Sequence, residues 1–346
     1  MIKADIIIEE SNFLTEALKK LDKNPTMQTL LVEQNRKIIG TITDGDIRRG
    51  LLNGLTKESR VSEFMFSEFT YLINGKYEQD KINLIKQKKL KIVPELNEDG
   101  TLCRIINFNE VKTILPIDAV IMAGGIGSRL MPLTEHTPKP MLKIGEKPIM
   151  EYNIDLLKSY GITNLTLSVK YLAEKISSYY GDGKTKGIKI SYVHEKEPLG
   201  TIGAIKQIQD FQNDYVLVMN SDLLTNINLE SMFSDLISND SDMIVATTDY
   251  KVQIPYGVVE SDGNKIIALK EKPTYTYYSN AGIYIFKRKY VDLIPSDTFF
   301  NATDLLEKLI DKNKKVLHYQ INNYWLDIGK HADFERANND VANLTF

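Results

Sequence analysis

The stretch AGGIGSRLMPLTEHTPKPMLKIGEKPI, residues 123–149, decides the interpretation of this chain. It follows the short apolar run IDAVIM, which is typical of a buried strand, and it opens with three glycines: Gly124, Gly125 and Gly127. Glycines lack a Cβ and so let backbone amides approach phosphate groups closely. Arg129 adds a planar fork of donors, and Lys139 stands between two prolines in a stiff loop that can hold a cation in place. The spacing fits neither the dinucleotide pattern G-x-G-x-x-G nor the P-loop pattern that ends in Gly-Lys-Ser/Thr.

Downstream of this loop, helical and strand-like segments alternate. Helical periodicity in NIDLLKSY, AEKISSYY and AIKQIQ is followed each time by an apolar run, which reads NLTLSV, KISYV or YVLVM. Strand–helix alternation with apolar strands is typical of a mostly parallel sheet covered by helices on both faces. The sequence therefore predicts an α/β fold with a Rossmann-like mixed, mostly parallel sheet over residues 116–346.

Candidate ligand-binding positions occur in five further segments. They are Glu195, Leu199, Gly200, Thr201 and Ala204 in EKEPLGTIGA, Ser221 and Asp222 in MNSDLLT, Glu271 and Lys272 in KEKP, Asn280 and Gly282 in NAGIYIF, and Asp327 in NYWLDIGKH. Asp222 follows an apolar strand, at the edge where open α/β sheets present ligands and metals. Each position also has a structural alternative, because such an aspartate can cap a helix and a Glu-Lys pair can form a solvated turn. Their co-occurrence with the glycine loop favours a binding site.

The first 115 residues show a different pattern and contain an internal repeat. Residues 12–66 predict helix, strand, strand and helix in that order, and residues 78–115 repeat this order and end in a predicted helix over NEVKTIL. Pro116 favours a short linker here, because proline disfavours helix in the residue before it. We expect a smaller α+β domain over residues 1–115, with one copy at about 1–66 and a second at about 67–115.

Composition restricts the class of protein. The formal net charge is −3 and like charges do not cluster, which argues against a nucleic-acid partner. Cys103 is the lone cysteine, so an intrachain disulfide framework is excluded and a reducing compartment is expected. The N-terminal residues lack the apolar core of a signal peptide, and no run reaches the ~18 apolar residues of a membrane span. These observations predict a cytoplasmic protein with no membrane partner.

Residues 117–346, about two thirds of the chain, resemble the sugar-1-phosphate nucleotidyltransferases. The likeness rests on GGxGxRLxPLT, PKPM and KPI, followed in order by the later motifs. It implies transfer of a nucleoside monophosphate to a sugar 1-phosphate, release of pyrophosphate, and Mg²⁺ as the cofactor. It also implies two catalytic residues: Arg129 would hold the leaving pyrophosphate and Lys139 would neutralise the α-phosphate. Asp222 and Asp327 would bind Mg²⁺, which suits two carboxylates completed by phosphates and water.

The same resemblance assigns the other positions to the substrates. The nucleotide would contact Ala123, Gly124, Gly125, Gly127, Glu195, Leu199, Gly200, Thr201, Ala204 and Ser221. The sugar phosphate would contact Glu271, Lys272, Asn280 and Gly282. EPLGTIGA looks like the segment of guanylyltransferases of the heptose and hexosamine type, so GTP is the expected nucleotide. The two-domain arrangement resembles the glucosamine-1-phosphate guanylyltransferases of the legionaminic acid pathway. Glucosamine 1-phosphate is therefore the expected sugar, with mannose 1-phosphate and a heptose 1-phosphate as alternatives.

The segment IIGTITDGDIRRGLL, residues 38–52, resembles the second half of a CBS motif, so the doubled unit looks like a CBS pair. In that family such pairs bind adenine nucleotides, which makes AMP, ADP or ATP the expected ligand, and Thr43 and Asp46 match the contacting positions. The second copy lacks the Thr-x-x-Asp pattern, which leaves one ligand site at most. CBS pairs commonly associate, so a homodimer or higher homo-oligomer is expected. A module that only dimerises or solubilises the enzyme is the alternative.

Other classes of function are less consistent with the sequence. A non-catalytic nucleotide sensor with a degenerate transferase domain would be expected to lack one of Arg129, Lys139, Asp222 and Asp327, yet all are present. A glycosyltransferase would be expected to carry Asp-x-Asp where residues 220–222 read Asn-Ser-Asp. A nucleic-acid-binding regulator would need a basic stripe.

Overall fold

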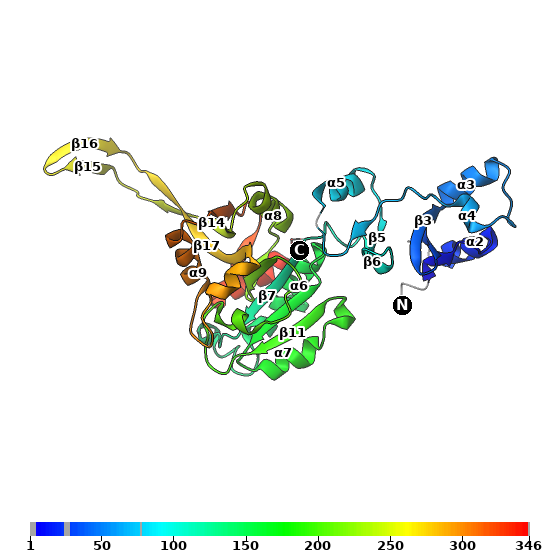
Figure 1. Cartoon of the computed structure of the whole chain (residues 1–346). Coiled ribbons are helices and arrows are strands. Elements are labelled where there is room, and N and C mark those ends of the chain that lie inside the picture. The colour runs from blue at the N-terminus through cyan, green and yellow to red at the C-terminus, as the bar shows by residue number, and fades with distance from the viewer. Residues whose placement is uncertain (1–4, 24–27, 77, 345–346) are drawn as a thin grey trace. The chain divides into compact units, whose positions relative to one another are not determined.

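The computed structural model of the 346-residue chain describes residues 5–23, 28–76 and 78–344. The chain divides into two compact units, Met1–Pro116 and Ile117–Phe346, and each is described by itself (Figure 1). Within the described residues no helix is long and apolar enough to span a bilayer.

The second unit is built on a seven-stranded mixed sheet with the order β11-β10-β7-β12-β17-β14-β18. Its strands are β7 (Ile117–Ala123), β10 (Asn164–Val169), β11 (Lys189–His194), β12 (Tyr215–Asn220), β14 (Met243–Gln253), β17 (Thr274–Lys287) and β18 (Val316–Gln320). Neighbouring strands are parallel except at β17, which runs antiparallel to both β12 and β14. The predicted α/β class with a mostly parallel sheet is confirmed.

Helices cover both faces of this sheet (Figure 1). They are α6 (Ile149–Ser159), α7 (Ala173–Tyr180), α8 (Leu229–Ser238), α9 (Ala302–Asp311) and α10 (His331–Val341). Alternate residues of a strand point to opposite faces. On one face Val120, Val218 and Phe286 form a core with Leu305 and Leu309 of α9. The strand residues between them face the other way and are buried too, which explains why these strands are continuous apolar runs.

Short elements shape the loops at the edges of the sheet. Two small sheets pair β8 (Lys143–Ile144) with β9 (Lys147–Pro148) and β13 (Leu223–Thr225) with β19 (Trp325–Asp327). The 3-10 helices are η1 (Ser128–Leu130), η2 (Lys139–Met141), η3 (Lys184–Lys186), η4 (Gly203–Gln207) and η5 (Arg288–Leu293). In the segment AIKQIQ, predicted to be α-helical, only residues 204–207 are helical, and they belong to the 3-10 helix η4. The amides of Ile202 and Gly203 at its start donate to the Phe300 carbonyl oxygen, which ties this short turn to another part of the chain.

A long hairpin extends β14 and β17 beyond the sheet. The two strands stay paired as far as Gln253 and Thr274, and the hairpin of β15 (Val258–Asp262) and β16 (Lys265–Lys270) follows at the tip. We call residues 248–279 the arm. Figure 1 shows it projecting from the second unit, coloured yellow.

The first unit contains two three-stranded sheets, each with one parallel and one antiparallel pair. The first has β1 (Ile7–Glu9), β2 (Thr29–Gln34) and β3 (Lys37–Thr43), with α2 (Leu14–Lys23), α3 (Asp44–Leu52) and α4 (Val61–Phe64). The second has β4 (Leu72–Ile73), β5 (Ile92–Leu96) and β6 (Leu102–Asn107), with α5 (Gln79–Gln87). The helix predicted over residues 109–115 is wrong. The Asn107 side chain accepts from the Asn109 amide at 3.1 Å, and such a local turn competes with helix.

Candidate active site

The glycine loop follows β7 at the carboxyl edge of the parallel strands. Gly127 has φ +69°, a left-handed conformation that favours glycine, and its carbonyl oxygen accepts from Thr134 Oγ1 at 2.9 Å. A Cβ on Gly127 would lie 3.0 Å from the Cβ of Lys139, so the loop and the lysine are in close contact. A Cβ on Gly125 would meet nothing within 4 Å, so this backbone faces open space. The loop therefore has a packed side and an accessible side.

Lys139 forms an ion pair with Asp222. Lys139 stands at the start of η2 and is only 9% exposed, whereas Asp222 follows the end of β12. Ser221 beside it is buried, and its amide donates to the Met122 carbonyl oxygen of β7 at 3.2 Å. The carboxylate of Asp222, directly beyond β12, thus holds the Lys139 ammonium group next to the glycine loop.

Asp327 lies next to Asp222. Leu223 of β13 pairs with Asp327 of β19, and the Ile328 amide donates to the Asp222 carbonyl oxygen at 3.0 Å. The Oδ1 atoms of both carboxylates are buried and have no hydrogen-bond partner. Burial raises the pKa of the Asp327 carboxyl above its ordinary range, and the Asp222 carboxylate raises this pKa further, whereas Lys139 and Arg129 lower it.

These two carboxylates fit a divalent cation. Buried acceptor atoms without a partner are uncommon in folded proteins, and a hard cation satisfies carboxylate oxygens directly. No group of three or more acidic, histidine or cysteine side chains with metal-binding geometry occurs among the described residues. Two protein ligands suit Mg²⁺, which ordinarily completes its shell with phosphate oxygens and water.

Arg129 lies on the exposed side of the site. Its guanidinium group is packed against Gly329, because a Cβ on that glycine would lie 3.4 Å from Arg129 Nη2. The ring of His331 is 3.0 Å from the Met131 carbonyl oxygen, so the start of α10 is fastened to the same loop. His331 therefore has a structural role, and Gly329 is a contributor that the sequence analysis missed.

The segment EKEPLGTIGA begins at the glycine loop and ends against α9. Glu195 accepts from Ser168 Oγ at 2.5 Å and from the Leu199 amide at 3.1 Å, and a Cβ on Gly124 would lie 2.8 Å from its Oε1. The side chains of Leu199 and Ala204 are buried in a core cluster. Their contribution to a bound base could therefore come only from their backbone groups.

The remaining positions of that segment are explained by packing. Gly200 has φ +74°, and a Cβ there would lie 2.7 Å from the Phe300 carbonyl oxygen. Thr201 Oγ1 accepts from the Ala302 amide at 2.8 Å, at the first residue of α9. These contacts fix the segment to the residues around Phe300 and Ala302, about 100 positions later in the sequence.

Asn280 and Gly282 lie at a bulge in β17, where the pairing with β14 shifts. Gly282 has φ +73°, and a Cβ there would lie 2.6 Å from Asn220 Nδ2, at the end of β12. The Gly282 amide donates to Asn280 Oδ1 at 3.0 Å. Bulges next to active sites commonly re-aim a side chain, and here the bulge lies beside β12, whose end is followed by Asp222.

Glu271 and Lys272 are not brought to this site within one chain. Both are exposed and lie on the arm, between β16 and β17, with Glu271 Oε2 near Gly257. Lys272 lies two residues before β17, and the six-residue step from Thr274 to Asn280 along that strand spans about 20 Å at the usual ~3.3 Å per residue. The four predicted sugar-phosphate positions therefore do not form one cluster in the single chain.

In the first unit Thr43 and Asp46 hold each other. Thr43 Oγ1 and the Thr43 amide both donate to Asp46 Oδ2, at 2.6 and 2.8 Å, and Thr43 Oγ1 accepts from the Asp46 amide at 3.3 Å. This is a capping box at the start of α3, with Arg49 adding an ion pair to Asp46 at 2.6 Å. The Thr-x-x-Asp spacing thus has a complete structural explanation, and the CBS ligand role stays a prediction.

Two curated proteins similar to this chain act on sugar phosphates. It is 34% identical over 239 residues to a UTP–glucose-1-phosphate uridylyltransferase of Synechocystis, covering 63% of this chain and 62% of that protein. It is 34% identical over 228 residues to a D-glycero-alpha-D-manno-heptose 1-phosphate guanylyltransferase of Aneurinibacillus thermoaerophilus, covering 65% of this chain and 98% of that protein. The chain thus spans less than two thirds of the length of the uridylyltransferase.

Comparison with solved structures and with families agrees with this similarity. A crystal structure from Bacillus anthracis, assigned as a glucose-1-phosphate thymidylyltransferase in complex with a sucrose, has a TM-score of 0.55 and 25% identity. The match covers 66% of this chain and 97% of that one. The Nucleotidyl transferase family model matches residues 118–343, which span the sheet, the glycine loop and both aspartates, and the chain therefore belongs to the nucleotidyl transferase family.

Proposed function

We propose that this chain transfers a nucleoside monophosphate from a nucleoside triphosphate to a sugar 1-phosphate and releases pyrophosphate. One observation carries the proposal: two adjacent carboxylates with buried, unpartnered oxygens lie beside Lys139 at a glycine loop. A purely structural ion pair would be expected to satisfy its buried acceptors. The unsatisfied oxygens therefore support a ligand-binding role for this cluster.

The proposed reaction makes one bond and breaks one. A sugar-phosphate oxygen bonds to the α-phosphorus, the bond from that phosphorus to the bridging oxygen breaks, and the electron pair leaves with pyrophosphate. The nucleophile is largely ionised near neutral pH, because a phosphate monoester has a second pKa of about 6. No general base is needed, so the chain must hold polyanions in line and neutralise their charge.

The charged residues divide this task. Lys139 Nζ, held by Asp222, is proposed to contact the α-phosphate, and Arg129 on the exposed side is proposed to hold the leaving pyrophosphate. Asp222 and Asp327 are the residues that would hold Mg²⁺. When bound, the ion would supply charge neutralisation between the two phosphate groups. The glycine backbone, above all the open Gly125, is proposed to cradle the triphosphate.

The proposed substrates are GTP and glucosamine 1-phosphate. Similarity to a heptose 1-phosphate guanylyltransferase over 98% of that protein's length supports GTP. The sugar rests on the resemblance of the two-domain arrangement to the legionaminic acid pathway enzymes, and mannose 1-phosphate and a heptose 1-phosphate remain the alternatives. For the first unit we propose a CBS pair that binds one adenine nucleotide, in a cytoplasmic enzyme that forms homo-oligomers.

The test is a substrate screen by pyrophosphate release. Four nucleoside triphosphates are each combined with glucosamine, mannose, heptose and glucose 1-phosphates in the presence of Mg²⁺, with and without AMP. GTP with glucosamine 1-phosphate is expected to react fastest, and AMP is expected to change the rate. The Asp222→Asn protein, purified in parallel, measures contaminating activity. No release from any combination would contradict the transferase proposal, whereas release from another combination would replace only the substrates.

A further inference from the structure

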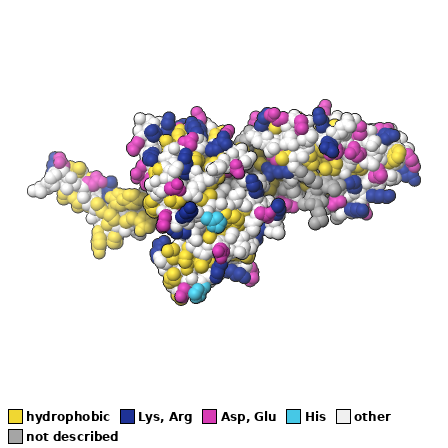
Figure 2. Space-filling model, turned by 60° about the horizontal axis from the view of Figure 1, so that its bottom comes forward, with side chains coloured by type: hydrophobic (Ala, Val, Ile, Leu, Met, Phe, Trp, Pro, Cys, Tyr) yellow, Lys and Arg dark blue, Asp and Glu magenta, His cyan; other side chains and the backbone are white. Residues whose placement is uncertain are grey.

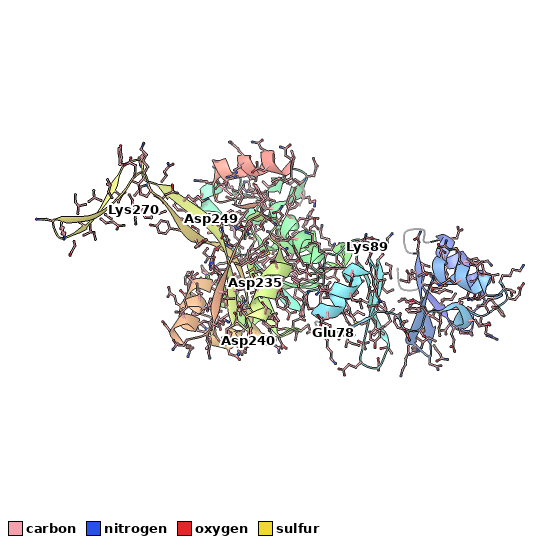
Figure 3. The ribbon with its side chains drawn as sticks, turned by 90° about the horizontal axis from the view of Figure 1, so that it is seen from above. Glu78, Lys89, Asp235, Asp240, Asp249 and Lys270 are labelled. Carbon is pink, nitrogen blue, oxygen red and sulfur yellow. The ribbon has the colours of Figure 1, made fainter. Side chains whose placement is uncertain are left out.

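The arm leaves the second unit at the same edge of the sheet as the site. Pairing of β12 with β17 stops at Met219 and Ile283, and pairing of β14 with β18 stops at Thr247. Beyond these points the arm strands pair only with each other in the described sheets, although Asp249 and Tyr278 at the base of the arm still contact Gln320 and His318 of β18. Figure 3 labels Asp249 where the arm leaves the body and Lys270 about halfway along the arm. The arm therefore starts beside Asn280 and extends away from its own body.

One face of the arm is apolar and uncovered. Tyr250 lies opposite Tyr277, and Val252 lies opposite Tyr275, so these four side chains share one face. Tyr250 is 61% exposed and Tyr277 is 58% exposed. The opposite face carries Asp249, Lys251, Gln253, Thr274 and Thr276, together with Tyr278 opposite Asp249 at the base of the arm. The ribbon thus has the amphipathic pattern of a strand pair with one buried face, and within the described residues of the second unit that face is left uncovered.

The tip continues the same pattern. Val259 lies opposite Leu269, and they are 49% and 66% exposed. On the other face Lys270 forms an ion pair with Glu260 at 2.5 Å. Figure 2 shows hydrophobic side chains gathered along the arm. The tip hairpin therefore also has exposed apolar residues on one of its faces.

Such a surface is consistent with an interface. An isolated two-stranded hairpin is marginally stable in water, and exposed contiguous apolar patches mark interaction sites. Tyrosine is enriched at the centres of protein interfaces, where its ring is buried and its hydroxyl keeps a polar partner. The arm would be stabilised if its tyrosine and valine face were covered.

We propose that a second copy of this chain covers the arm, and that the two copies exchange arms across a two-fold axis. Folding back onto its own body would require the arm to break the continuous β14–β17 pairing from Thr247 to Gln253. A second copy presents the same surface, so the contact is self-complementary and closes. Exchange also places Glu271 and Lys272 at the edge of the partner's sheet, beside the partner's own Asn280 and Gly282, which a single chain does not achieve. This second part rests on the proposed function.

The first test measures the interface without using activity. Light scattering with sedimentation compares the full-length chain with a Tyr250→Ser, Tyr277→Ser variant. The matched control is Lys251→Ser, Thr276→Ser on the polar face of the same strands. We expect a dimer for the wild type and the control. The dissociation constant of the apolar-face variant should be at least about 100-fold higher, the scale of losing two interface anchors. Circular dichroism establishes that all three are folded. A monomeric wild type, or an apolar-face variant that dimerises like the control, would overturn the proposal.

The second test asks whether Lys272 acts on the partner's site. Lys139→Ala and Lys272→Ala chains carrying different affinity tags are co-expressed, and heterodimers are isolated through both tags. Exchange leaves one complete site per heterodimer, so about half of wild-type activity is expected, although each variant alone is impaired. No recovery would overturn exchange. If Lys272→Ala alone is fully active, Lys272 has no role in the proposed function and is not supplied to the partner's site. The dimer measurement would still test the apolar interface separately.

Discussion

The carboxylates of Asp222 and Asp327 lie side by side because β13, which begins directly after Asp222, pairs with β19, which ends at Asp327. Leu223 pairs with Asp327, and the Ile328 amide donates to the Asp222 carbonyl oxygen at 3.0 Å. Two negative charges are thereby held together and partly buried, and among the described residues Lys139 forms an ion pair with one of them, Asp222. This arrangement costs stability unless a cation is present, and such costs are typical of binding sites.

Replacing Asp327 with asparagine should separate stability from metal binding. Without divalent metal, Asp327→Asn removes one of two neighbouring charges and should raise the free energy of unfolding by about 1 kcal/mol. Mg²⁺ stabilises the wild type by binding only the folded state, so its effect on the melting temperature should vanish in the variant. Thermal unfolding with and without Mg²⁺ measures both effects, with Asp311→Asn, an exposed aspartate at the end of α9, as the control. Equal stabilisation of Asp327→Asn and wild type by Mg²⁺ would remove this residue from the metal site.

The raised pKa of Asp327 gives a specific pH dependence. Its ionised form is disfavoured in the fold, so its contribution to metal-free stability is fully present below the ordinary value of 3.8 and is lost as pH rises through the higher folded-state pKa. Mg²⁺ needs the ionised carboxylate, so its affinity should change in the opposite direction and weaken as pH falls through that pKa. Calorimetric titration from neutral pH down towards the ordinary value of 3.8 should show the Kd for Mg²⁺ rising several-fold. A Kd that stays constant over this range would contradict the titration of Asp327 at the site.

Lys139→Ala should lower turnover by ~10²-fold or more, the scale of losing one preorganised charge stabiliser. The ammonium group is nearly buried and is held by Asp222, so no neighbouring side chain replaces it readily. The effect should fall mainly on kcat, because the charge at the α-phosphate is proposed to build up in the transition state. Steady-state pyrophosphate release measures it, and Lys143→Ala, an exposed lysine in β8, is the matched control. Wild-type turnover of the Lys139 variant would sink the catalytic assignment.

The glycine loop offers a matched pair of substitutions. Gly127→Ala would place a Cβ at φ +69° and 3.0 Å from the Lys139 Cβ, so it should lower the free energy of unfolding by about 1–3 kcal/mol. Gly125→Ala meets nothing within 4 Å and should change stability by less than about 0.5 kcal/mol. If the open Gly125 backbone contacts the triphosphate, this second variant should instead raise KM for the nucleotide. Chemical denaturation and steady-state kinetics distinguish the two, and equal stabilities would contradict the packing of Gly127.

The fold was predictable because buried parallel strands have a simple signature. Continuous apolar runs between helical segments specify the sheet, and carboxyl-end aspartates such as Asp222 fall at its binding edge. Other features depend on contacts that the local sequence does not encode. The need for glycine at Gly200 is set by the Phe300 carbonyl oxygen, which lies 100 positions away.

The arm shows a second limit of sequence reasoning. Its alternating apolar pattern is the same whether the face packs on its own body or on another copy. The separation of Glu271 and Lys272 from Asn280 follows from the unbroken length of β17, which the motif KEKP does not reveal. The motifs therefore predicted which residues are candidates for the site, whereas the length of β17 determines which of these candidates lie close together in one chain.

The Thr43–Asp46 pair allows a structural role to be separated from a ligand role. Asp46→Ala removes one half of the capping box and leaves the Thr43 amide without its 2.8 Å acceptor, so the first unit should lose about 1 kcal/mol of stability, whether or not nucleotide binds. Asp46→Asn keeps an acceptor oxygen for that amide and should retain most of the stability, while it removes the charge that a ribose hydroxyl would contact. AMP affinity, measured by calorimetry on the full chain, should then fall in both variants if Asp46 binds the nucleotide. AMP that binds wild type and Asp46→Asn equally would leave Asp46 with its capping role alone, because Asp46→Asn loses the carboxylate charge, one acceptor oxygen and the ion pair with Arg49.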